Sequence, residues 1–113
     1  MRILGIFRGF PGLGRVVSGV SLLETLRDCY ACEVKMISYL QGNRYLESRG
    51  YTDIQEAIPM DYSSIGLVPT NRMGVFIHST IKSFSPDIVL IDGEPLIIQA
   101  LRISYPNLKI VTL

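Results

Sequence analysis

The sequence has almost no net charge and no long hydrophobic run. Eleven basic and ten acidic side chains in 113 residues leave a formal charge of +1, so no broad positive field exists to hold nucleic acid. No stretch reaches the ~18 apolar residues of a membrane-spanning helix, and the apolar run between Arg2 and Arg8 is too short for a signal peptide. We therefore expect a protein that binds no nucleic acid and that resides in the cytoplasm, either free or at the membrane surface.

Histidine and cysteine are also scarce, which limits metal and redox chemistry. A structural zinc site needs four ligands, whereas the chain offers only His78 and the pair Cys29 and Cys32. A redox CxxC pair works at a helix N-terminus, but this pair falls at the tail of the first predicted helix. We interpret the cysteines as ordinary packing or surface residues and His78 as a residue on a helix flank. We expect no metal and no cofactor.

What the sequence does contain is a distinctive opening stretch, residues 3–26, ILGIFRGFPGLGRVVSGVSLLETL. An apolar strand over 3–7 is followed by a glycine-rich turn and by a helix that opens at residue 15. This is how a Rossmann-like sheet begins, and the turn presents backbone N–H groups and a positive helix end to the crevice above the sheet. Functional residues are therefore expected at the strand ends that face this turn.

Apolar segments alternate with helical patterns along the whole chain, which predicts parallel strands joined by right-handed crossovers. We predict one α/β domain over 1–113, a Rossmann-like doubly wound parallel sheet of about five strands in the order 3-2-1-4-5, within three α/β/α layers. Because the chain stops inside its last strand, we expect it to be part of a larger protein. The predicted strands are 3–7, 33–38, 53–58, 87–91 and 108–113. Predicted helices begin at residue 15 and at residues 42–43, and two more run from 70 or 71 to 84 and over 96–104. The segment 60–69 is predicted to be a loop.

Two segments, 9–15 and 92–95, should converge at the carboxyl ends of the first and fourth strands, where open parallel sheets bind ligands. The glycines do not fit the dinucleotide pattern GxGxxG in register and no GK[ST] follows them, which argues against a bare NAD or ATP site. Asp92 after DIVLI also resembles a receiver phospho-acceptor. However, a receiver needs further acids after the first strand, where this chain has Arg8. Asp92 is then either a structural residue, which caps the following helix or braces a neighbouring backbone N–H, or a ligand-contacting group.

Four pieces match, in order, the N-terminal domain of GT-B glycosyltransferases of the MurG-like group. They are GLGRVVSGVSLLETL, SYLQGNRYLESRGY, the helix before SPDIVLIDGEP, and the terminal KIVTL. The corresponding pieces of these enzymes run roughly as GxGHxxR with a helix, SYGxGxxxLxxxGY and PDxVISDxEP, so the chain resembles this family over nearly its whole length. One position departs from the pattern, because Arg15 replaces the histidine after GxG. Arginine cannot act as a base at neutral pH, although it can hold phosphate or carboxylate.

The resemblance implies the acceptor-binding, N-terminal half of a two-domain enzyme that moves a sugar from a nucleotide sugar to an acceptor hydroxyl. The acceptor would be a sugar, lipid-linked or a small molecule, and the nucleotide sugar would bind a C-terminal domain that these residues do not include. The isolated chain is then expected to be inactive. It is also expected to self-associate as a homodimer through Phe10, Leu13 and residues 65–68. The alternative is a non-catalytic Rossmann-like binding or interaction module, which Arg15 favours.

The candidate site residues follow from the converging segments and from the resemblance. We expect the glycines to let an acceptor approach the backbone and the arginine at the helix start to hold an anionic group. A carboxylate opposite them would orient or deprotonate the acceptor hydroxyl. The catalytic candidates are Asp92 and, second, Glu94; the ligand-binding candidates are Gly12, Leu13, Gly14, Arg15 and Gly42.

Overall fold

The protein is built around a sheet whose strands all run in the same direction. The computed structural model describes residues 1–51, 60–61, 68–69 and 71–113. Across the described sheet the strand order is β2-β1-β5-β6, and every neighbouring pair is parallel. The bounds of these strands are Arg2–Phe7 for β1, Glu33–Ile37 for β2, Ile88–Asp92 for β5 and Lys109–Thr112 for β6.

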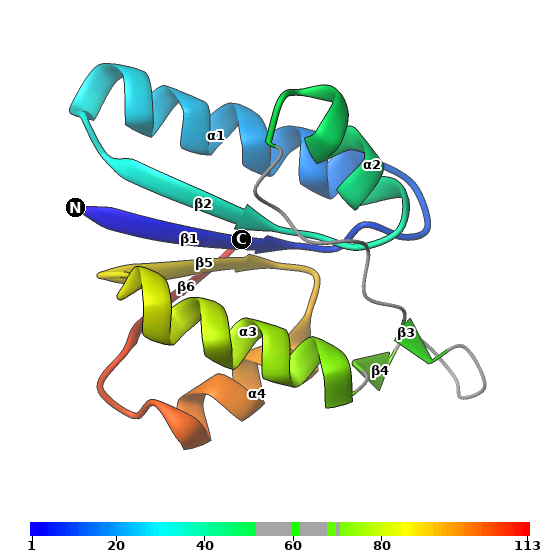
Figure 1. Ribbon diagram of the computed structural model, residues 1–113, viewed down its shortest axis with the longest axis vertical. Helices are drawn as coiled ribbons and strands as arrows, with labels where there is room; N and C mark the ends of the chain where they lie inside the picture. The colour runs from blue at the N-terminus through cyan, green and yellow to red at the C-terminus, as the bar shows by residue number, and fades with distance from the viewer. Residues whose placement is uncertain (52–59, 62–67, 70) are drawn as a thin grey trace.

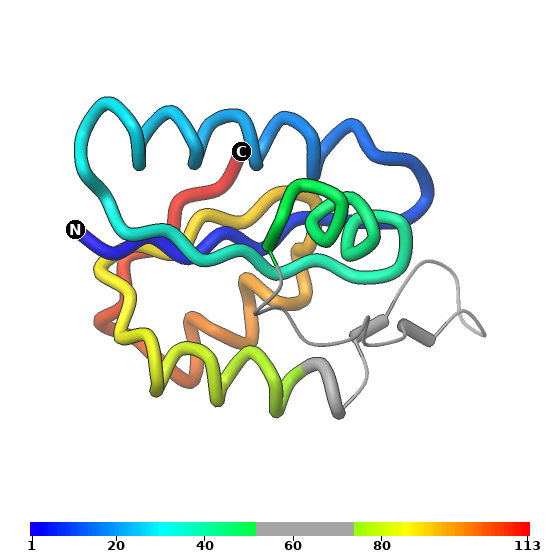
Figure 2. Tube along the Cα trace, turned by 45° about the horizontal axis from the view of Figure 1, so that its top comes forward, coloured from blue at the N-terminus to red at the C-terminus, as the bar shows by residue number. Residues whose placement is uncertain are grey.

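Helices follow the strands of the described chain and cover both faces of the sheet. Helices α1 and α2 lie on one face and α3 and α4 on the other (Figure 1), and Figure 2 shows the same layering from a second direction. Parallel neighbours require long crossover connections, and helices in those connections pack on the sheet faces. The architecture is therefore α/β in three layers, consistent with a Rossmann-like fold. The helix bounds are Gly14–Tyr30 for α1, Gln41–Ser48 for α2, Asn71–Phe84 for α3 and Pro95–Ser104 for α4.

Alternating side chains along the central strand divide the core into two halves. Ile3 and Phe7 of β1 pack with α1, whereas Leu4 and Ile6 pack with α3 and α4. All four side chains are buried, as expected for a strand that is covered on both faces. The half on the α1 side consists of Ile3, Phe7, Val16, Val20, Leu23, Met36, Leu46 and Leu90, and the other half of Leu4, Ile6, Ile37, Tyr39, Ile77, Ile81, Val89, Ile91, Ile97 and Leu101.

Phe7 fixes how closely α1 approaches the sheet. A Cβ on Gly5 or on Gly19 would lie 2.5 Å from the Phe7 ring, so the ring fills a slot between β1 and α1 that two glycines leave open. The apolar stripe of α1, which repeats at helical spacing, lies against the sheet at Val16, Val20 and Leu23.

The predicted strand order is confirmed for the strands that the structure describes, but the strand count is not. Four of the predicted strands correspond to β1, β2, β5 and β6 and have the predicted neighbours, so the sheet has four strands within the described residues rather than the predicted five. The remaining predicted strand, 53–58, lies outside the described residues. The segment 60–69, predicted as a loop, contains an antiparallel ladder between β3 (Met60–Asp61) and β4 (Val68–Pro69). Two-residue strands are too short to leave a periodic signal in the sequence.

The cysteines and the histidine lie where the sequence placed them. Cys29 is exposed in the last turn of α1 and Cys32 is half-buried just before β2, and both thiols are free. His78 is exposed on α3, and its Nδ1 is in hydrogen-bond contact with the hydroxyl of Tyr105. The predicted positions of these residues, at the surface or partly buried, are confirmed.

Candidate functional site

The carboxyl ends of β1 and β5 form the point where the chain changes direction across the sheet. From β1 the chain continues to β2 on one side, and from β5 it continues to β6 on the other. Phe7 and Asp92 are paired at the ends of these two strands, and the next N–H, that of Arg8, donates to the carbonyl of Asp92 at 3.0 Å. Ligands of open parallel sheets bind outside the strand ends at such a switch point.

An ion pair between Arg15 and Asp92 crosses this point. The Nη1 of Arg15, in the first turn of α1, donates to Oδ1 of Asp92, which is the last residue of β5. The Asp92 side chain is only 11% exposed, whereas the Arg15 side chain is 52% exposed. Asp92 does not occupy the cap position of α4, which is held by Glu94. The structure therefore brings two predicted site residues together and gives Asp92 a partner other than the following helix.

The glycine loop between β1 and α1 is open above the helix start. A Cβ added to Gly12 or to Gly14 would meet no atom within 4 Å, and Gly12 has a φ of +85°, which L side chains rarely adopt. The N-cap of α1 is Leu13, 39% exposed, whose side chain has no acceptor for the first-turn N–H groups. The N–H of Gly12 donates to Oε1 of Gln41 at 2.8 Å, which attaches the loop to α2.

Glu94 lies in a different environment from Asp92. Its side chain is 1% exposed, and Oε1 accepts a hydrogen bond from the hydroxyl of Tyr39, which follows β2. The Nε of Arg8 lies 3.7 Å from the same oxygen, close enough for an ion pair but too far for a hydrogen bond. Burial raises the pKa of Glu94, opposed by the Tyr39 hydrogen bond and by the Arg8 charge. Burial, and then the hydrogen bond to Glu94, raise the pKa of Tyr39, so its hydroxyl remains a proton donor.

Gly93 separates the two carboxylates and allows two arginines to converge. It has a φ of +82°, and a Cβ here would lie 2.8 Å from Cδ of Arg15 and 2.9 Å from Cβ of Arg8. The absence of a side chain at Gly93 thus lets both arginine stems lie against the turn between β5 and α4.

The remaining candidate, Gly42, is buried and lies in a packed junction. Its N–H donates to the carbonyls of Gly9 and Tyr39, each at 3.0 Å. A Cβ at Gly42 would lie 2.0 Å from Oγ of Ser38 and 2.7 Å from Cα of Gly9. Close packing of α2 on the glycine loop therefore explains this glycine, whereas Gly12 and Gly14 are the positions that face open space.

Sequence reasoning missed Arg8 and Tyr39 as members of the site. Both lie near the carboxyl end of a strand. Arg8 directly follows β1, and Tyr39 lies two residues after the end of β2. The rule that ligands bind at strand ends could have pointed to both positions. Their attachment to Glu94, however, depends on how the three loops fold over one another.

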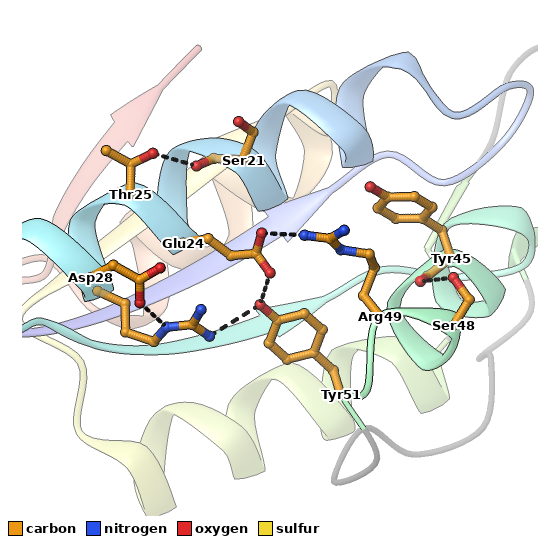
Figure 3. A network of polar contacts seen from close by, with 9 residues as sticks. Ser21, Glu24, Thr25, Asp28, Tyr45, Ser48, Arg49 and Tyr51 are labelled. Carbon is orange, nitrogen blue, oxygen red and sulfur yellow. Dashed lines mark hydrogen bonds and ion pairs between the residues drawn. The ribbon is translucent and has the colours of Figure 1, made fainter.

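A second polar cluster lies between α1 and the end of α2 and has a structural role (Figure 3). Glu24 accepts hydrogen bonds from Tyr51 and from Arg49, each at 2.6 Å, and Arg27 donates to the Tyr51 hydroxyl at 3.3 Å. The hydrogen bond from Tyr51 and the charge of Arg49 lower the pKa of Glu24. Both oxygens of the carboxylate are engaged, so the cluster attaches the end of α2 to α1.

Within the described residues, no group of three His, Cys, Asp or Glu side chains is arranged to hold a metal ion. No helix of the described chain is long and apolar enough to cross a membrane. Comparison of the chain with protein-family models, with curated proteins and with solved structures found no match.

Proposed function

We propose that this chain is the acceptor-binding domain of a GT-B glycosyltransferase, which moves a sugar from a nucleotide sugar to an acceptor hydroxyl. The observation that carries the proposal is the concentration of buried polar groups at the switch point. Burying such groups costs stability unless they are paired, so their gathering at one edge favours a binding site there. Among the described residues, four of the five buried polar or charged side chains lie at this edge: Ser38, Asn43, Asp92 and Glu94.

The open loop supports the assignment of the acceptor side. The space above Gly12 and Gly14 would let a sugar approach the backbone, and the exposed guanidinium of Arg15 would hold an anionic group of the acceptor. Asp92, 11% exposed beside that guanidinium, is the candidate for orienting or deprotonating the acceptor hydroxyl. Glu94 is the second candidate, and it would have to leave Tyr39 to reach a substrate.

The order of the sequence motifs supports the transferase class. In the GT-B arrangement a second domain holds the nucleotide sugar, and the acceptor, lipid-linked or a small molecule, binds the first. Transfer needs both substrates aligned in one cleft. We therefore expect the purified 113-residue chain to bind an acceptor and to transfer no sugar, and turnover of a nucleotide sugar by this chain would contradict the assignment.

One observation favours the alternative, a non-catalytic Rossmann-like binding or interaction module. The carboxylate of Asp92 is already paired with Arg15, which stands in the place of the family histidine. If that ion pair persists when a ligand binds, Asp92 stabilises the fold, and the switch point binds ligands or partners without catalysing a reaction.

An NMR titration of the ¹⁵N-labelled chain distinguishes the two functions. The probes are a panel of simple glycosides and glycosyl phosphates, with a nucleotide sugar as the comparison. We expect the acceptor-type compounds to shift the amide signals of Gly12, Gly14 and Gly93 at lower concentrations than the nucleotide sugar does.

The informative variant is Gly14→Ala, because a methyl group there meets no atom of the protein and intrudes only on a ligand. Its control is Gly74→Ala, on α3, where a methyl group also meets open space. Gly14→Ala should melt at or above the temperature of the parent and bind the acceptor at least several-fold more weakly, whereas Gly74→Ala should bind normally. Saccharide titrations without any shift, or equal binding by both variants, would refute the acceptor function.

A further inference from the structure

We propose that Arg8 is a second anion-binding residue of this site and that, together with Arg15, it holds a phosphoryl group carried by the ligand. This inference rests on the acceptor site proposed above and adds a residue and a ligand chemistry to it. Buried Glu94 and Tyr39 are positioning residues in this view, since they hold the Arg8 stem beside the site.

The first observation is an unmet hydrogen-bonding group on Arg8. Its Nε is buried and has no hydrogen-bond partner within the described structure. The nearest carboxylate oxygen, Oε1 of Glu94, is 3.7 Å away and already accepts the hydroxyl proton of Tyr39. A buried donor that lacks an acceptor costs stability, so a ligand oxygen that reached it would remove an existing penalty.

The second observation is the convergence of two arginines on one glycine. The stems of Arg8 and Arg15 both lie against Gly93, where a Cβ would be within 3 Å of each. The side chains are 33% and 52% exposed, so both reach solvent at the strand ends. The stems of the two arginines therefore meet at one turn although they come from different elements, the end of β1 and the first turn of α1.

The number of hydrogen-bond donors at the site favours a phosphoryl group over a carboxylate. Arg15 already has a carboxylate partner in Asp92. A ligand carboxylate would only exchange one carboxylate partner of Arg15 for another. A phosphoryl dianion offers more oxygens and two charges, which can engage both guanidinium groups at once. The open first turn of α1 adds N–H groups on the same side.

The test uses inorganic phosphate as the probe and the Nε–Hε signals of the arginines as the readout. In the wild-type chain we expect saturable shifts of the Arg8 and Arg15 Nε signals and of the Gly93 amide. Removing one charge-assisted hydrogen bond of this kind weakens binding by about tenfold or more, so Arg8→Gln should show that loss and Arg8→Lys a smaller one. Arg44→Gln, which removes an exposed arginine of α2, is the charge-matched control and should bind within about twofold of the parent.

Two further arms identify the source of the phosphoryl group and keep the inference testable if Arg8 variants fold poorly. Glucose 1-phosphate represents a soluble ligand, and phosphatidylcholine vesicles with phosphatidic acid represent a lipid-borne one; binding of either through Arg8 supports the proposal. The wild-type Nε shift requires no variant. An unshifted Arg8 signal, or an Arg44→Gln loss as large as that of Arg8→Gln, overturns it. If glycosides bind but phosphate leaves the Arg8 Nε signal unchanged, this inference alone is refuted. If phosphate binds but no saccharide does, the acceptor function alone is refuted.

Discussion

Gly42→Ala should destabilise the protein although it introduces the residue with the best helix propensity into a helix. In α2 the exchange of glycine for alanine is worth about 1 kcal/mol in favour of folding. The added Cβ, however, would lie 2.0 Å from Oγ of Ser38 and 2.7 Å from Cα of Gly9. Ser38 can turn to relieve the first contact, but the second involves a backbone atom and requires the glycine loop or α2 to shift.

Movement of Ser38 has its own cost. Its buried hydroxyl donates to the carbonyl of Phe7 at 2.8 Å, and turning it away leaves that hydrogen bond unmade, at about 1–3 kcal/mol. Overpacking adds about 1–3 kcal/mol. After subtraction of the helix propensity, Gly42→Ala should lose roughly 3 kcal/mol, or roughly 10 °C in melting temperature for a domain of this size.

Chemical denaturation followed by circular dichroism measures this loss, with Gly74→Ala as the control. Gly74 is an exposed glycine of α3 with open space around it, so alanine there should stabilise by about 1 kcal/mol. Opposite signs for the two substitutions are the expected result. A Gly42→Ala protein as stable as the parent would refute the packing argument and return Gly42 to the list of ligand-binding candidates.

Three other predictions follow from the described structure. Leu90→Asp places an uncompensated charge in the central strand β5 and should prevent folding; a cooperative melt near that of the parent would contradict the central position of the strand. The pKa of Glu24 is lowered in the folded chain, so its contribution to stability is complete above its ordinary value of 4.5 and is lost as the pH falls further. The stability difference between the parent and Glu24→Gln, measured by urea titration, should therefore shrink below that pH. Self-association stays a prediction: Phe10 packs partly against the core, residues 65–67 lie outside the described part of the chain, and Leu13 is exposed. Leu13→Ser should therefore shift any dimer seen by sedimentation toward monomer.

The sequence alone determined the parts of this protein that depend on local patterns. The apolar run of β5, the glycine turn before α1 and the stripe of Val16, Val20 and Leu23 fixed the α/β class, because burial on two faces or on one stripe leaves a readable period. The parallel order of β2, β1 and β5 followed from the crossover rule. The meeting of Arg15 with Asp92 was also within reach, since parallel strands bring their carboxyl ends to one edge.

Only the tertiary structure decided what each residue of the site does. Glu94 and Asp92 are two positions apart in the sequence. Glu94 is nevertheless hydrogen-bonded to Tyr39, whereas Asp92 is paired with the exposed Arg15. Gly42 and Gly14 are both glycines near a helix start, but backbone and side-chain atoms fill the space at the first and no atom lies near the second. These differences arise from contacts between loops that are distant along the chain, and no local periodicity encodes them.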